Sequence, residues 1–578
     1  MLEFIQHLKQ RYQIVLGRMD KRSPRYLDYQ QRADQLLFAE AFIRKGRLIA
    51  EHPDLPMQIA VIGPTQSGKS STVNLLLNSH QAGVSPLAGY TVQAQGFCHA
   101  VSAEAMPGLQ TYFGRFERVA VGELAPGRLD CYAIGTSPLR SPLLPPCVCW
   151  DTPDFDSIDA ADYREGLVRA IALADAVILL VSKEKYADQS VWDIMSILES
   201  LRQPTLIVVN KLGEGQEAVI IDSLAEKWRA ARRDPVPNVV PLHFRRLPDQ
   251  PSWPKAAEQA VLELVKSVSR RKYNQYQQQL LTRFWPHWLE PVYAEHQSQR
   301  HWRTLVDQCL ARALKDYQRD YLNHPHHYET FQQAVLNLLT LLEIPGLAGL
   351  LAKTRRAMTW PMRKLFGSKS AAVSASQEIA VLTQIGDHVM IQLADRLLEI
   401  AETEADDARW WKETSGALRQ QRGDISSAYQ RAVLNYHGNF QQDVEAAAQR
   451  LYRKLQEQPL ILNSLRATRA TTDAGAVLLT IQAGGIGLHD LVLMPLMLTA
   501  TSLLAESTLG GYMARVEADL KQHQLHTVNA ALFEHCLQRR LYALPGQIAS
   551  NSRFDIDETE CRQAEQALQD KKHGLRIL

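Results

Sequence analysis

Residues 63–71 have the composition and spacing of a phosphate-binding loop. They follow the pattern G-x-x-x-x-G-K-S, and run Gly63-Pro64-Thr65-Gln66-Ser67-Gly68-Lys69-Ser70-Ser71. Backbone N–H groups of such a loop converge on a phosphate, and the helix N-terminus behind them favours negative charge. Glycine at position 68 permits close backbone approach and a positive φ. We expect Lys69 to act catalytically on the β- and γ-phosphate oxygens, and the Ser70 hydroxyl to ligate Mg²⁺.

A loop of this kind needs a strand before it and a helix after it. The apolar run 59–62 is typical of a strand and stops at Gly63, whereas the apolar residues of 73–77 have the spacing of a helix. This strand–loop–helix context separates a phosphate loop from a chance match. A Gly-Ser turn that merely resembles the motif is the alternative.

A second polar group follows an apolar run further along the chain. The stretch Cys147-Val148-Cys149-Trp150 ends in Asp151, and Thr152-Pro153-Asp154 comes next. An aspartate at a strand end that faces a phosphate loop is a usual Mg²⁺ ligand or a support for one. A surface turn would also suit this composition. We interpret Asp151 as a metal-site residue.

The strands that position these groups are expected to form a mostly parallel sheet. Two more apolar runs, 176–182 and 204–212, alternate with helical segments, and the second contains Asn210-Lys211. Such alternation predicts an α/β P-loop nucleotide-binding domain with helices on both faces of the sheet. Ligands of such sheets bind at the carboxyl ends of the strands, where every motif named above falls. Residues 107–145 are a longer insertion, which we expect to add strands at the sheet edge.

The order GPTQSGKS, Thr91, DTPD and NK resembles the translation-factor-related GTPases over roughly residues 56–245. Within that class, GKSSTVNLLL is similar to the Era-like and dynamin-like branches. The resemblance implies GTP and Mg²⁺ as ligands and a switch role for Thr91, which would close over the metal and the γ-phosphate. It also implies nucleotide contacts by Asp154, Asn210 and Lys211.

The sequence departs from the family pattern at three positions. Asp154 stands where the D-x-x-G motif has glycine, and Gly213 replaces the aspartate of N-K-x-D, with Glu214 beside it as a substitute. Thr65 stands where dynamins carry a glutamine that holds the attacking water. Gln66 stands where Era-like proteins often carry an asparagine that helps to bind a monovalent cation, so K⁺ is a further implied cofactor. The best candidate for the base loop is 241–243.

Composition limits the compartment and the partners. The 578 residues include 64 basic and 62 acidic side chains, so no global field favours nucleic acid or an anionic membrane. The seven cysteines are scattered without a C-x-x-C pair, which is typical of a reduced, cytosolic protein. The N-terminus has no signal-peptide core. We expect a cytoplasmic protein that can be peripheral at the inner face of a membrane.

We expect three regions along the chain. Residues 1–55 have the spacing of two amphipathic helices, the second beginning at Ser23-Pro24. Their apolar faces pack either on the nucleotide-binding domain or with helices from the far C-terminus, since periodicity gives a face but not its partner. The nucleotide-binding domain spans 56–270. Residues 271–578 are predicted to form a large all-α domain.

Two stretches of the helical half suit a membrane or a buried core. In 338–369, an apolar part (338–352) leads into a basic part that mixes arginine and lysine with aromatic and aliphatic residues. Such a mixture suits an anionic membrane, RNA, or a solvated helix edge. The second stretch, 474–505, has two uncharged segments that are each too short for a comfortable single span. It is either the centre of a helical bundle or a hairpin that enters one leaflet.

These observations predict a GTP-binding protein, a GTPase with slow basal turnover, that couples nucleotide state to a helical domain at a membrane. A homodimer through the nucleotide-binding domain would supply groups that the loop lacks. One alternative is a nucleotide-binding scaffold with little hydrolysis, because the DTPD and NKLG motifs are altered. Another is an Era-like GTPase that binds RNA or the ribosome.

Overall fold

The computed structural model describes most of the chain, in two compact units. The described residues are 1–84, 91–104, 106–125, 127–155, 161–213, 215–231, 235–243, 253–323, 372–403, 408–457, 510–548 and 553–574. Unit 1 comprises Met1–Tyr293 and Asn551–Leu578, and unit 2 comprises Ala294–Ser550. The division falls within one long helix, α9 (Tyr273–Tyr317). Unit 1 therefore draws on both ends of the sequence.

Unit 1 is built around an eight-stranded sheet in the order β3-β4-β2-β5-β1-β6-β7-β8. The neighbours β5, β1, β6, β7 and β8 are parallel, and β2 pairs antiparallel only with β5. The strands are β1 (Met57–Ile62), β2 (Gln95–His99), β3 (Glu117–Val119), β4 (Cys131–Thr136), β5 (Cys147–Asp151), β6 (Ala176–Ser182), β7 (Thr205–Leu212) and β8 (Asn238–His243). The expected mostly parallel sheet is confirmed. The 107–145 insertion adds β3 and β4 at one edge, as predicted.

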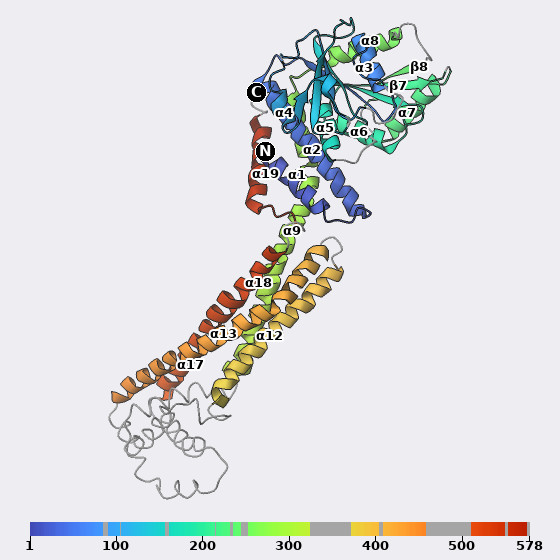
Figure 1. Cartoon of the computed structure of the whole chain (residues 1–578). Helices are drawn as coiled ribbons and strands as arrows, with labels where there is room; N and C mark the ends of the chain where they lie inside the picture. The colour runs from blue at the N-terminus through green and yellow to red at the C-terminus, as the bar shows by residue number, and fades with distance from the viewer. Residues whose placement is uncertain are drawn as a thin grey trace, which may run out of the picture. The chain divides into compact units, whose positions relative to one another are not determined.

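Alternate residues of the central strands enter two separate cores, because successive side chains of a strand point to opposite faces. In β1, Ala60 and Ile62 belong to one core, whereas Ile59 and Val61 belong to the other. Helices cover both faces (Figure 1). The helices are α3 (Lys69–Leu77), α4 (Leu109–Phe113), α5 (Ala161–Leu173), α6 (Gln189–Ser200), α7 (Glu217–Ala231) and α8 (Lys255–Ser267). The first core includes residues of α5, α6 and α7, and the second includes residues of α3 and α8.

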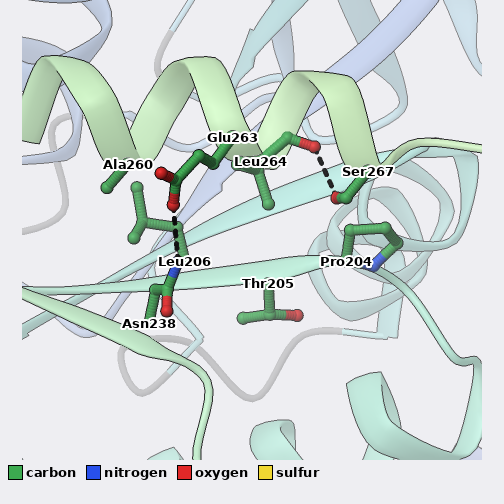
Figure 2. A pocket seen from close by; sticks show the side chains of 8 residues that line it. All are labelled: Pro204, Thr205, Leu206, Asn238, Ala260, Glu263, Leu264 and Ser267. Atoms are coloured by element: carbon green, nitrogen blue, oxygen red, sulfur yellow. Dashed lines mark hydrogen bonds between the residues drawn. The ribbon is translucent and has the colours of Figure 1, made fainter.

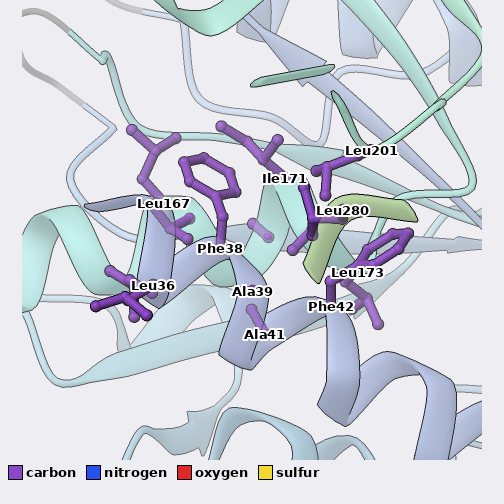
Figure 3. Packing of buried hydrophobic residues seen from close by; sticks show 14 of the residues in the cluster. Leu36, Phe38, Ala39, Ala41, Phe42, Leu167, Ile171, Leu173, Leu201 and Leu280 are labelled. Atoms are coloured by element: carbon purple, nitrogen blue, oxygen red, sulfur yellow. The ribbon is translucent and has the colours of Figure 1, made fainter. Parts of the chain in front are cut away.

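The two N-terminal helices, α1 (Leu2–Leu16) and α2 (Pro24–Glu51), share the first core with the sheet. Ser23 caps α2 through its hydroxyl, which accepts from Tyr26 N at 3.1 Å, and Pro24 takes the first turn, so the predicted helix start is confirmed. Figure 3 shows Leu36, Phe38 and Phe42 of α2 among apolar residues of α5.

The last helix of the chain, α19 (Glu558–Gly574), also belongs to unit 1. Phe554, just before it, packs edge-on against Tyr12 at 4.8 Å between ring centroids, and Arg11 donates to the carbonyls of Arg553 and Phe554. His7 lies 2.9 Å from the carboxylate of Glu560. The N-terminal helices thus contact the nucleotide-binding fold and a C-terminal segment at once, and both packing alternatives contribute.

Unit 2 is helical in its described part (Figure 1). The C-terminal part of α9 packs with α12 (Ala372–Thr403), α13 (Ala408–Gln456) and α17 (Gly510–Val528), and continues into the π-helical turn η2 (Gln318–Leu322). A second π-helical segment, η5 (Asn529–Gln538), leads into α18 (Arg539–Ala543) and η6 (Leu544–Gln547). The predicted large helical region is confirmed.

A buried carboxylate connects four helices of unit 2. Glu378 of α12 is 2% exposed and accepts at Oε1 from Tyr317, Tyr436 and Gln524, at 2.7, 3.0 and 2.8 Å. Its Oε2 lies 3.1 Å from Nδ1 of His437. Burial opposes ionisation, but these partners together lower the pKa of Glu378. A charge removed from water is tolerated here because both carboxylate oxygens have hydrogen-bond partners.

Both candidate membrane stretches, 338–369 and 474–505, lie outside the described residues. Within the described ranges, no helix combines the length and the apolarity that crossing a membrane requires. The alternatives for these stretches therefore stay predictions.

Candidate functional site

The phosphate loop lies between the end of β1 and the start of α3. Helix α3 begins at Lys69, with Gly68 at its N-cap in the left-handed region at φ 95°. Gln66 also has a positive φ, 60°. At Gly63, a Cβ atom would lie 2.5 Å from Ser67 Oγ and 2.6 Å from the carbonyl oxygen of Leu180, so a side chain does not fit. The loop therefore needs glycine at 63 for space and at 68 for backbone conformation.

Lys69 is directed into this loop and is almost fully buried, with 5% of its surface exposed. Its ammonium donates to the carbonyl oxygens of Gly63 and Pro64, at 3.1 and 3.2 Å. It also forms an ion pair with the carboxylate of Asp154. The residue at the position of the family's glycine thus contacts the lysine of the phosphate loop directly.

Ser70 and Asp151 meet beside the loop. The Ser70 hydroxyl donates to Oδ2 of Asp151 over 2.7 Å, and lies 3.4 Å from the hydroxyl of Thr91. Asp151 is the last residue of β5 and is fully buried. Burial raises the pKa of Asp151 to about 6, against the lowering effect of the Ser70 hydroxyl.

The three residues fit a hard divalent cation. Oδ1 of Asp151 is buried and has no hydrogen-bond partner among the described residues. An orphaned carboxylate oxygen beside two hydroxyls is a set of oxygen donors of the kind that Mg²⁺ prefers. A bound cation would satisfy Oδ1 and favour the ionised carboxylate.

The remaining predicted residues lie along the same edge of the sheet. Asn210, at the carboxyl end of β7, donates from its side-chain amide to the carbonyl of Ser67 over 2.8 Å. Its side-chain oxygen accepts from the backbone N–H of Lys211, which has φ 61° at a β-bulge. Leu212 pairs with His243, so the candidate base loop 241–243 reaches this edge too. Glu214 lies outside the described residues.

Four further residues of the segment 63–71 differ in exposure. Thr65 is half-buried, Gln66 is exposed, and the Ser71 side chain is exposed on α3. Ser67 is buried, and its hydroxyl has no hydrogen-bond partner among the described residues. A phosphate oxygen or a water would satisfy that hydroxyl.

Two supporting residues were not predicted from the sequence. The Thr152 hydroxyl donates to the carbonyl of Val61 over 2.9 Å and so fixes the end of β5 against β1. The Tyr163 hydroxyl donates to the backbone carbonyl of Asp154 over 2.7 Å. Thr152 follows an apolar strand next to Asp151, which is a detectable signal. No spacing rule connects Tyr163 to Asp154, because α5 could start in any orientation.

Fold and site define a P-loop nucleotide-binding domain: a parallel sheet, a G-x-x-x-x-G-K-S loop at a strand end, and an aspartate at the end of the adjacent strand. Residues 58–211 match the family described as 50S ribosome-binding GTPase. This part of the chain is a P-loop GTPase domain, and its family implies GTP and Mg²⁺ as ligands.

Solved structures give weaker similarities. An Era structure in complex with MgGDPNP and nucleotides of 16S ribosomal RNA is 17% identical, with a TM-score of 0.22, and the match covers 33% of this chain and 51% of that one. This chain thus spans about half the length of the Era structure. A bacterial dynamin of an oligomerised pair, described as sensing and tethering membranes, is 12% identical over 96% of both chains, with a TM-score of 0.36.

A third structure, of chloroplast translocon components atToc33 and psToc159, is described as a GTPase for which dimerization is important. It is 16% identical, with a TM-score of 0.24, over 40% of this chain and 92% of that one. No match was found among curated proteins.

Proposed function

We propose that the protein binds GTP with Mg²⁺ at the loop 63–71 and hydrolyses it slowly. The observation that carries the proposal is the contact of Ser70 with Asp151, whose second carboxylate oxygen is buried without a partner among the described residues. It supports a metal site made of Ser70, Asp151 and Thr91, next to the lysine that would neutralise phosphate charge.

In this proposal each residue has one task. Backbone N–H groups of the loop hold the β-phosphate, and Lys69 offsets the charge that develops on the transferred phosphoryl group. The bound Mg²⁺ would neutralise β- and γ-phosphate oxygens. Asn210 supports the loop through Ser67 and accepts from the backbone N–H of Lys211, and we propose that the two residues contact the base. Thr65 has no amide to orient water, so turnover of the isolated chain is expected to be slow.

A nucleotide-binding scaffold with little hydrolysis is the second candidate. The ion pair between Lys69 and Asp154 favours it, because a carboxylate near the γ-phosphate adds charge where negative charge already accumulates. In the GTPase proposal, but not in the scaffold proposal, a homodimer, a monovalent cation near Gln66 and an anionic membrane would raise turnover. RNA is a less favoured partner than an anionic membrane. The proposed membrane contact depends on residues 338–369 and 474–505, which lie outside the described residues.

The test is GTP hydrolysis by the full chain. Initial rates are measured across protein concentration, with and without anionic liposomes and K⁺, after binding of GTP, ATP and xanthosine triphosphate has been titrated. The GTPase proposal expects turnover per subunit to rise with concentration or lipid. A flat, negligible rate in protein that binds GTP would contradict it and favour the scaffold.

A further inference from the structure

We propose that Asp154 sets the choice between nucleoside diphosphate and triphosphate, because its carboxylate competes with the terminal phosphate for Lys69. The inference rests on the proposed function, since it requires that the loop binds a nucleotide. It goes beyond that function by assigning a specificity role to a residue at which the family pattern has no side chain.

The N–H donors of Lys69 already have acceptors within the protein. An ammonium group has three N–H donors. In this structure Lys69 has three acceptors: the carbonyl oxygens of Gly63 and Pro64, and the carboxylate of Asp154. A phosphate oxygen can contact the ammonium only by replacing or sharing one of them. The two carbonyls belong to the loop backbone, so the Asp154 side chain is the group that can yield.

The surroundings make that displacement costly. Asp154 is only 6% exposed. Its backbone is held because Tyr163, itself buried, donates to its carbonyl over 2.7 Å. Thr152, two residues earlier, is anchored to Val61, and Pro153 restricts the backbone between them. The carboxylate therefore stays close to Lys69 even when a phosphate takes its hydrogen bond.

The two nucleotides differ in how much charge they bring to this carboxylate. A β-phosphate is held largely by loop N–H groups, whereas a γ-phosphate extends beyond them toward the lysine and the end of the neighbouring strand. Asp151 and Asp154 both stand at that end. Mg²⁺ would offset the charge of Asp151, but Asp154 has Lys69 as its cation. Like charges in a buried site repel strongly, so the triphosphate is penalised more than the diphosphate.

The experiment compares Asp154→Asn and Asp154→Gly with the wild-type full chain. Equilibrium affinities for GDP and for a non-hydrolysable GTP analogue are measured with Mg²⁺ present. Asn keeps the size of the side chain and removes its charge, whereas Gly restores the family residue; thermal unfolding checks that both variants fold. Asp54→Asn is the matched control, because it removes the same charge from an exposed turn before β1.

We expect the ratio of triphosphate to diphosphate affinity to rise by about tenfold or more in both Asp154 variants, and to stay unchanged in the control. An unchanged ratio in folded Asp154 variants that bind both nucleotides would overturn this inference and make Asp154 a structural partner of Lys69 only. Failure of every protein, wild type included, to bind either nucleotide would instead overturn the proposed function.

Discussion

Asn210 at the end of β7 touches the phosphate loop at two neighbouring residues: its amide donates to Ser67 O over 2.8 Å, and lies against Gly68. A Cβ atom at position 68 would be 2.5 Å from that amide nitrogen. Asn210, which the sequence predicts to contact the base, therefore also supports the phosphate loop, so a base contact at this residue would be coupled to the loop.

Gly68→Ala is expected to lower nucleotide affinity by about tenfold or more and stability by about 2 kcal/mol, since an L-residue in the left-handed region is strained and would also collide with Asn210. Nucleotide titration and thermal unfolding measure the two effects. Gly122→Ala is the control, because a Cβ there meets nothing within 4 Å. Equal effects of the two substitutions would contradict the account of the loop.

Lys69→Ala is expected to abolish triphosphate binding and to destabilise unit 1 by about 3 kcal/mol, because it leaves the Asp154 carboxylate buried without its cation. Lys69→Ala combined with Asp154→Asn should regain most of the stability but none of the affinity. Titration calorimetry and thermal unfolding of the four proteins of this cycle separate the two effects. Unchanged GTP affinity in Lys69→Ala would remove the central proposal.

Glu40 on α2 predicts an acid-sensitive contact between the N-terminal helices and α5. Burial alone would raise its pKa, but Lys9, Gln6 and Arg169 outweigh burial and lower the pKa of Glu40 from 4.5 to about 2. Because the pKa of Glu40 is lower in the folded protein, ionised Glu40 stabilises the fold. This stabilisation is complete above pH 4.5 and is lost as the pH falls toward 2. The shift corresponds to about 3 kcal/mol.

The test is Glu40→Gln, compared with wild type by urea unfolding across acid pH. The wild-type advantage should shrink steadily as pH falls through this window, whereas Glu51→Gln, at the exposed end of the same helix, should show no such trend. A stability difference that is independent of pH would show that the ionisation of Glu40 is not coupled to folding stability.

Glu378→Leu in unit 2 is expected to destabilise the helical bundle by about 3 kcal/mol or more, because the hydroxyls of Tyr317 and Tyr436 and the amide of Gln524 lose their common buried acceptor. Hydrogen exchange of α12 and α13 in the full chain reports this unit separately. Glu402→Leu, exposed on the same helix, is the control. Equal protection in both variants would contradict the role assigned to Glu378.

The sequence predicted the fold class well because the signals are local. Apolar runs at 176–182 and 204–212 coincide with β6 and, within one residue, with β7, and the Ser23-Pro24 signal marks the start of α2. The strand order, the antiparallel pairing of β2 with β5, and the packing partner of α1 depend on contacts between distant residues. Periodicity specifies an apolar face without specifying what covers it.

The candidate site also has features that the sequence predicted and features that it could not predict. The order of motifs predicted that Ser70, Thr91 and Asp151 share one edge of the sheet, and the structure places them there. The pairing of Lys69 with Asp154 was not predictable, since it depends on how the chain turns after β5. Whether Asn210 and Lys211 read the base with Gly213 in the motif stays a prediction, which the nucleotide titration tests.

Unit 1 includes residues 553–574, which lie beyond the whole of unit 2 in the sequence. A ribosome making this chain therefore delivers α1, α2 and the sheet first, and supplies Phe554, the ring that packs on Tyr12 and Tyr29, only after unit 2 has emerged. At usual elongation rates that delay is on the order of tens of seconds. Until Phe554 emerges, the faces of Tyr12 and Tyr29 on which its ring packs lack this partner.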